Sequence, residues 1–312
     1  MLCLLTSFAN APVIAQKLTS DPEQVQLEVG DIRRLAQVLG SIDGRTAKDL
    51  APIIERQYLA KASPGLRSYA GNYKVTSDSI TSAIKAQPSL YADLDSLADA
   101  LLSEEKALLT AFRKLKVLFP DAVFPPIWFV VGHNGPGGLT RPEGVLIASE
   151  RFKDRPQDVV PLVLHELAHF QQAAVQGVDV YQRIYGPKRT LLALALREGT
   201  AELIAEITTG RHINPAAERY GLPREPQLWS KFRKEMHGGE TGDWMFVRPT
   251  NAEWPPDLGY WIGYRIAKSY YERADNKQKA ILDILGLTDF DAFLKASRYT
   301  GGIAKSIRLR YG

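Results

Sequence analysis

The chain has 312 residues, of which 45% are hydrophobic and 24% are charged. These values are typical of a folded globular protein with one large or two modest domains, and they exclude a disulfide-stapled miniprotein, a disordered polymer and a multi-span membrane protein. The formal net charge is +4, but no basic run is interleaved with aromatic residues, so nucleic acid is not an expected partner.

Residues 1–15 contain no charged side chain and consist of an apolar stretch followed by small residues. This pattern predicts a secretory signal peptide cleaved after Ala15, and therefore a periplasmic or secreted protein. The only cysteine, Cys3, lies inside this segment, so the mature protein would carry no thiol. Signal peptides usually begin with a basic residue, which is missing here, and a cytoplasmic protein with an uncleaved N-terminus is the alternative. No later apolar run approaches the roughly 20 residues that cross a bilayer, so no membrane span is predicted.

Residues 16–120 are predicted to form a helical N-terminal region. Apolar residues recur three and four positions apart over 24–40, 50–62 and 91–119, which is the spacing of amphipathic helices.

The pattern then changes to two short runs rich in β-branched and aromatic residues, over 124–132 and 144–152. They predict two strands joined by a glycine-rich loop, and hence a small antiparallel sheet. The loop lacks the lysine and the serine or threonine of a phosphate-binding loop, so it is expected to be an ordinary connection. Helical periodicity returns after residue 157, and the predicted fold class is predominantly helical α+β.

Residues 165–169 read His165-Glu166-Leu167-Ala168-His169, an HExxH pentapeptide inside an apolar helical run. On a helix the two histidines lie about 40° apart, so both imidazoles can reach one ion. Glu166 stands beside them, where it can take a proton from water. The sequence predicts His165 and His169 as metal ligands and Glu166 as the general base. A structural helix with incidental histidines is the alternative.

A catalytic zinc site needs a third protein ligand. Gln172 and Val175 occupy the positions where the extended HExxHxxGxxH motif has glycine and histidine, so a nearby third histidine is excluded. Glu198 is the next candidate, because it lies on an apolar helical stripe where a carboxylate must find a partner. Glu202, one turn further, is expected to orient a histidine as a hydrogen-bond acceptor.

The HELAH segment, followed after a helix-length gap by E-G-x-A-E, resembles the gluzincin zinc metallopeptidases. It looks closest to predicted zinc-dependent proteases of bacterial envelopes. The resemblance extends over about residues 125–300 and implies a zincin-like catalytic domain over 121–312. In this family the glutamate before glycine is the third ligand, which implies that role for Glu198 before Gly199.

The same enzymes carry a later helix that begins with tyrosine, followed three residues on by glycine and then an aromatic residue. Here that segment begins at Tyr260, and the resemblance implies that its phenol stabilises the oxyanion; Tyr264 and His237 are the alternatives. A strand beside the metal often pairs with extended substrate in this family, and residues 145–148 are the candidate strand. A core strand without substrate contact is the alternative. The G-x-M-E-N segment of the aminopeptidases is absent, which favours an endopeptidase.

The predicted function is therefore hydrolysis of peptide bonds in a peptide or protein substrate, with one Zn2+ ion held by His165, His169 and Glu198. An inactive zinc-binding envelope protein, acting as a binding or chaperone-like module, is the first alternative. A helical scaffold without metal is the second. His133 and His212 are expected in loops or at the surface, and the sequence does not indicate an oligomeric state.

Overall fold

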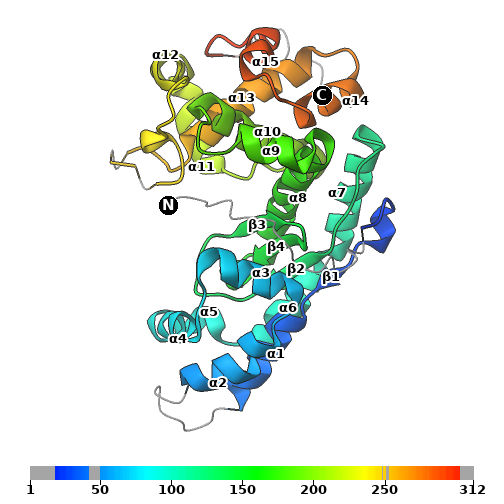
Figure 1. The fold of residues 1–312 in the computed structure, drawn as a ribbon, viewed down its shortest axis with the longest axis vertical. Coiled ribbons are helices and arrows are strands. Elements are labelled where there is room, and N and C mark those ends of the chain that lie inside the picture. Colours follow the sequence, from blue (N-terminus) through cyan, green and yellow to red (C-terminus); the bar gives the residue numbers. More distant parts are fainter. Residues whose placement is uncertain (1–17, 42–49, 248, 251–252, 303–312) are drawn as a thin grey trace. The chain divides into compact units, whose positions relative to one another are not determined.

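The computed structural model describes residues 18–41, 50–247, 249–250 and 253–302 (Figure 1). The predicted signal peptide and Cys3 lie outside these residues. The described chain forms two compact units. The N-terminal unit comprises residues 18–114 and 121–170, and the C-terminal unit comprises 115–120 and 171–302.

The N-terminal unit is largely helical, as its apolar periodicity predicts. Its helices are α1 (Gly30–Gly40), α2 (Leu50–Gln57), α3 (Pro64–Tyr73), α4 (Ser77–Ala86), α5 (Pro88–Tyr91), α6 (Leu94–Ser103), most of α7 (Glu105–Leu118) and the first two thirds of α8 (Val159–Gln176). Two of these helices begin at side-chain caps: Ser63 accepts a hydrogen bond from the Leu66 N–H, and Thr76 forms a capping box with Ser79.

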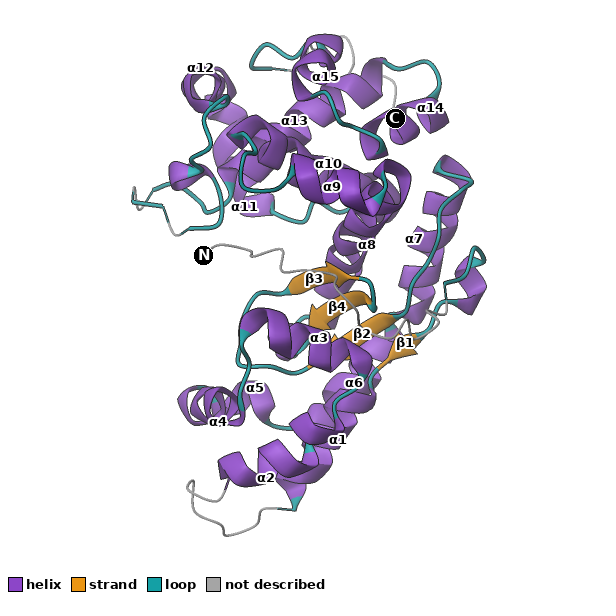
Figure 2. Ribbon diagram, viewed as in Figure 1, coloured by secondary structure: helices purple, strands orange, loops and turns teal. Residues whose placement is uncertain are grey.

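Four short strands form one sheet in the order β1-β2-β4-β3 (Figure 2). They are β1 (Leu27–Glu28), β2 (Ile127–Val130), β3 (Gly138–Arg141) and β4 (Gly144–Ala148). β2 runs parallel to both β1 and β4, and only β3 and β4 are antiparallel. The prediction of an antiparallel sheet is thus wrong, while the predominantly helical α+β class is confirmed.

The glycine-rich segment explains the difference in topology. It contains β3, which a run of Gly-Leu-Thr-Arg does not reveal, and the chain turns from β3 directly into β4. Because β3 occupies one edge of β4 as a hairpin partner, β2 pairs with the other edge, in parallel. All five residues of β4 are buried, as expected for a central strand covered on both faces.

Helices α3 and α8 cover opposite faces of the sheet. On one face Trp128 packs so closely on α3 that a Cβ atom at Gly65 would collide with its ring. On the other face Glu166 of α8 lies against Gly138 and Thr140 of β3. The sheet therefore forms one compact unit with the N-terminal helices, so this unit does not end at residue 120, where the predicted helical region ends.

A buried carboxylate anchors the glycine-rich segment, residues 132–143, by hydrogen bonds to its backbone. Glu150 is fully buried, and its Oε1 accepts hydrogen bonds from the backbone N–H groups of Gly132 (3.2 Å) and Asn134 (2.9 Å). Its Oε2 has no hydrogen-bond partner in the described part of the chain. Burial raises the pKa of Glu150 above its ordinary range, against the lowering effect of the backbone donors. Tyr91 also holds the segment, by donating to the Gly132 carbonyl at 3.2 Å.

The C-terminal unit includes the end of α8 and consists of helices whose connections are short, except for the long one over residues 236–257. Its further helices are α9 (Val178–Ile184), α10 (Leu191–Thr209), α11 (Pro215–Gly221), α12 (Glu225–Glu235), α13 (Leu258–Arg273), α14 (Lys277–Leu285) and α15 (Phe290–Ser297). α10 and α13 form the most extensive helix pair. Across the described residues, no helix combines the length and the apolar character needed to cross a bilayer.

The titration of Glu150 generates a testable prediction. Because its pKa is raised, the native protein holds a proton on this carboxyl at pH values where the unfolded chain has released it, so the wild type loses stability as pH rises through the folded-state pKa. Glu150→Gln keeps an oxygen acceptor and does not titrate. We expect its free energy of unfolding, relative to wild type, to improve as the pH rises above the ordinary titration range of a glutamate, in urea titrations. A difference between Glu150→Gln and wild type that stays constant with pH would refute the assignment.

Candidate metal centre

The side chains of the two histidines of the HExxH segment bring their Nε2 atoms together. His165 and His169 are 5% and 8% exposed, and their Nε2 atoms lie 3.1 Å apart with the rings perpendicular. Two imidazole nitrogens that bind one zinc ion at about 2.0–2.1 Å in tetrahedral geometry stand about 3.3 Å apart. A single shared proton is the other chemical means of holding two imidazole nitrogens this close.

Glu166 lies on the sheet side of the same helix and is 8% exposed. Its Oε2 is 3.0 Å from the Thr140 hydroxyl, which also lies 2.6 Å from the Glu166 backbone carbonyl. A Cβ atom at Gly138 would collide with the Glu166 carboxylate, so any larger residue at that position of β3 would displace this carboxylate from its present orientation. The glycine-rich segment thus has a purpose that the sequence did not reveal: it lets strand β3 approach the predicted general base.

Glu198 lies in the first half of α10 and is 3% exposed. Its Oε1 accepts from the guanidinium group of the preceding residue, Arg197, whose Nε lies at 2.8 Å and whose Nη2 contacts the same oxygen. Burial alone would lower the pKa of Arg197, but the Glu198 carboxylate raises it well above its ordinary value. Arg197 is therefore a fixed positive charge that balances a buried carboxylate.

Gln172 connects the end of α8 to α10. Its side-chain amide donates to the Arg197 carbonyl (3.0 Å) and to the Thr200 hydroxyl (2.8 Å). Gln172 lies one turn after His169 on the same helix, and Arg197 immediately precedes Glu198. Among the described residues, His165, His169 and Glu198 form a group that could hold a metal ion, each offering one ligand atom. The residue that replaces the glycine of the extended zinc motif thus fixes the helix that carries the third candidate ligand.

Two glycines allow α10 and α13 to touch backbone to backbone. A Cβ atom at Gly199 would collide with the backbone of Gly263 and Tyr264, and one at Gly263 would collide with the Ala195 carbonyl. Gly199 directly follows Glu198, and Gly263 lies one turn after Tyr260. The glycines of the E-G and Y-x-x-G segments therefore hold the two helices in contact beside the third candidate ligand.

The three candidates for the oxyanion role differ in their surroundings. The Tyr264 ring is fully buried, and its hydroxyl contacts the Glu206 carboxylate and accepts from Lys268 Nζ at 2.8 Å. Burial and the Glu206 charge raise its pKa far above the ordinary range. His237 is an exposed side chain with Nδ1 3.8 Å from Asp291. Tyr260 is partly exposed, and its phenol is close enough to Arg197 to affect the pKa of that residue.

Glu202 is 2% exposed, and its Oε2 has no hydrogen-bond partner in the described structure, so the expected bond to a histidine is not made through this oxygen. Burial, together with the negative charge of Glu198, raises the pKa of Glu202 well above its ordinary range. A protonated, neutral carboxyl group is therefore favoured at this position.

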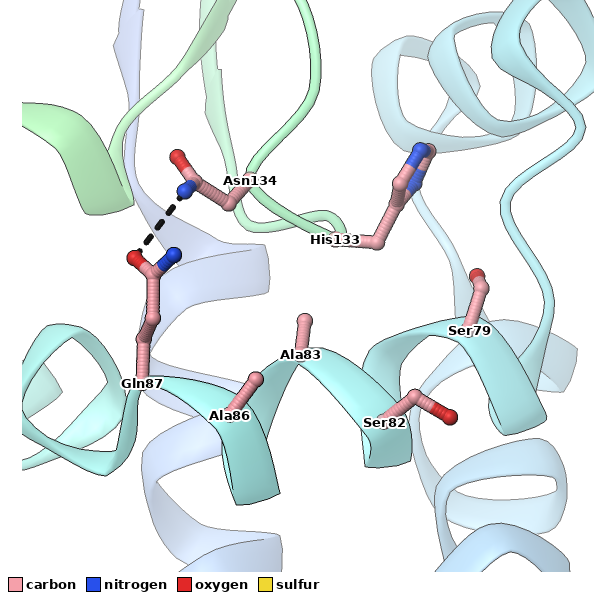
Figure 3. Close-up of a pocket in the computed structure, with 7 residues that line it drawn as sticks. All are labelled: Ser79, Ser82, Ala83, Ala86, Gln87, His133 and Asn134. Carbon is pink, nitrogen blue, oxygen red and sulfur yellow. Dashed lines mark hydrogen bonds between the residues drawn. The ribbon is translucent and has the colours of Figure 1, made fainter.

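The other two histidines do not join the cluster. His133 lies on the glycine-rich segment, as expected for a loop residue, where it lines a shallow pocket over α4 with Asn134 and Gln87 (Figure 3). His212 lies in the loop after α10, as expected, and is half-buried. Its Nδ1 accepts from the Asn214 N–H (3.0 Å), and its ring packs against Tyr264 at 4.6 Å, because the loop after α10 turns back onto α13.

Of the two interpretations of residues 145–148, the structure favours the core strand over the substrate-pairing strand. Residues 145–148 belong to β4, which is paired on both sides by β2 and β3. β3 is the edge strand, and among the described strands it has no partner on its outer side. Tyr73 partly caps this edge, because its hydroxyl donates to the Gly138 carbonyl at 3.2 Å.

Comparison with known families gives one finding. Residues 241–301 match the family described as Gliding motility protein GldB. The match covers less than half of the chain; it includes α13 and excludes α8 and α10. No curated protein and no solved structure gives a significant match.

The crossing of α10 and α13 can be tested by adding one methyl group. Gly263→Ala forces a Cβ atom against the Ala195 carbonyl, so the helices must separate, and we expect a loss of about 1–3 kcal/mol or more in the free energy of unfolding. Gly71→Ala is the matched control, since it lies on an exposed face of α3 with open space around it and should stabilise by about 0.5–1 kcal/mol. Urea denaturation measures both. Equal stabilisation of the two variants would contradict the close crossing.

Proposed function

We propose that this protein is a zinc-dependent peptidase in which His165, His169 and Glu198 hold a single Zn2+ ion. The observation that carries the proposal is the convergence of two imidazole Nε2 atoms 3.1 Å apart with a buried carboxylate in the same cluster. Two imidazoles and one carboxylate are a common donor set for catalytic zinc, and they leave a fourth position for water or substrate.

Zinc at such a site supplies Lewis acidity toward a substrate carbonyl and toward water. In the proposed mechanism Glu166 removes a proton from the attacking water and returns it to the leaving amine. The Thr140 hydroxyl supports this role, because it holds Glu166 Oε2 at 3.0 Å and so fixes one orientation of the carboxylate. Arg197 would hold Oε1 of Glu198 and thereby limit the rotation of the third ligand.

Tyr260 is the proposed donor to the developing oxyanion. Its partial exposure and its proximity to Arg197 support this choice over Tyr264, whose hydroxyl is engaged by Glu206 and Lys268. Removal of such a donor typically lowers turnover by about 10² to 10³. An extended peptide would pair with the outer edge of β3, displacing the Tyr73 hydroxyl from the Gly138 carbonyl.

The GldB match favours an envelope-associated protein, since that family is labelled as a lipoprotein family. It agrees with the predicted signal peptide and with a periplasmic or secreted location. The matched family is described by gliding motility, and a second candidate function fits an envelope protein of that kind. This second candidate is a zinc-binding envelope protein that holds peptides without cleaving them.

Metal analysis and one substitution test the proposal. We expect about one zinc per chain by elemental analysis of the purified protein, and loss of that zinc in His165→Ala. Glu166→Gln should retain the zinc, because Glu166 is not a ligand, and should lower cleavage of a peptide library by at least about 10².

Glu55→Gln, the same chemical change on an exposed helix face, should retain both zinc and activity. Zinc without cleavage in the wild type would favour the binding module. Absence of stoichiometric zinc from the purified protein would reject both zinc-dependent functions and favour the metal-free helical scaffold. The two histidines would then share a proton.

A further inference from the structure

A strained turn in front of α13 exposes two apolar side chains. Trp244 and Met245 are buried, and the chain then turns outward so that Phe246 and Val247 are 39% and 40% exposed. Phe246 adopts φ +64°. This left-handed conformation is unfavourable for a bulky aromatic residue, and such strain is concentrated at functional sites.

Asp257 holds this turn in place. Its Oδ1 accepts from the Phe246 N–H at 3.0 Å, and its backbone carbonyl accepts from the Tyr260 N–H at 3.0 Å. Asp257 also has a positive φ, +63°. One residue therefore fixes both the strained turn and the start of the helix that carries Tyr260, so the two have a defined relative position.

The exposed ring lies beside the proposed oxyanion donor. The Phe246 and Tyr260 rings meet edge to face, with centroids 5.9 Å apart. Tyr260 in turn interacts electrostatically with Arg197, which pairs with Glu198. Within the C-terminal unit, one ring contact and this electrostatic interaction therefore link the exposed apolar turn to the partner of the third candidate ligand.

We propose that Phe246 and Val247 form an apolar subsite that binds a bulky apolar side chain of the peptide next to the scissile bond. The inference rests on the proposed peptidase function and adds the substrate class to it. A phenylalanine or leucine side chain that contacts this turn removes apolar surface on both partners from water, whereas an alanine covers little of it. Substrates with a large apolar residue at this position are therefore preferred.

Peptide binding tests the subsite independently of catalysis. The probes are fluorescein-labelled nine-residue peptides with one glycine, serine and lysine framework and two central residues, both Phe, both Leu or both Ala. They are titrated against the zinc-loaded Glu166→Gln protein by fluorescence anisotropy. We expect the Phe and Leu peptides to bind about tenfold tighter than the Ala peptide. Addition of Phe246→Ala should remove the preference, and Phe246→Leu should largely retain it.

Leu222→Ala is the matched control, because this leucine is 40% exposed elsewhere in the same unit, and it should leave the preference unchanged. Thermal melting of each variant confirms that it folds. Equal binding of the three peptides, or a preference that persists in Phe246→Ala, would overturn the subsite. Cleavage by the wild-type protein is scored separately by mass spectrometry. A preference that depends on Phe246 without any cleavage would support the subsite and reject the peptidase.

Discussion

The backbone contact between α10 and α13 is the constraint on which the candidate centre depends. Gly199 and Gly263 remove the side chains that would keep the helices apart, and each lies within one turn of a proposed functional residue. Helices whose side chains interdigitate are usually 8–10 Å apart, so a backbone contact places neighbouring residues unusually close together. Arg197 and Tyr260 come within electrostatic range of each other for this reason, although some 60 positions separate them in the chain.

Charge balance is the second constraint on the centre. A buried carboxylate without a partner is very costly, and Arg197 provides a partner for Glu198 whether or not a metal is bound. The folded protein therefore need not rely on zinc to tolerate Glu198. Within the part of the chain that the structure describes, no cation pairs with Glu202; burial raises its pKa and favours a neutral group at this second buried acid.

Much of the fold and of the centre could be predicted from the sequence, because long periodic helices and the HExxH spacing are local signals. Glu198 could be selected because a carboxylate on an apolar stripe needs a partner. Strand β3 could not be predicted, because its four residues carry no strand pattern of their own and become a strand only by pairing with β4. The contacts of Gln172 and Thr140 could not be predicted either, because both are long-range and neither residue belongs to a motif.

The hydroxyl group of Tyr73 on the edge of β3 has a wider consequence. An unpaired strand edge is an adhesive surface that attracts strands of other molecules, and proteins usually protect such edges. Here a single phenolic hydrogen bond shields one carbonyl of a four-residue strand. One hydrogen bond is weak enough for a specific extended ligand to displace, yet it still hinders non-specific strand pairing. The same contact would therefore protect the edge against self-aggregation when it is formed and open the edge to a ligand when it is broken.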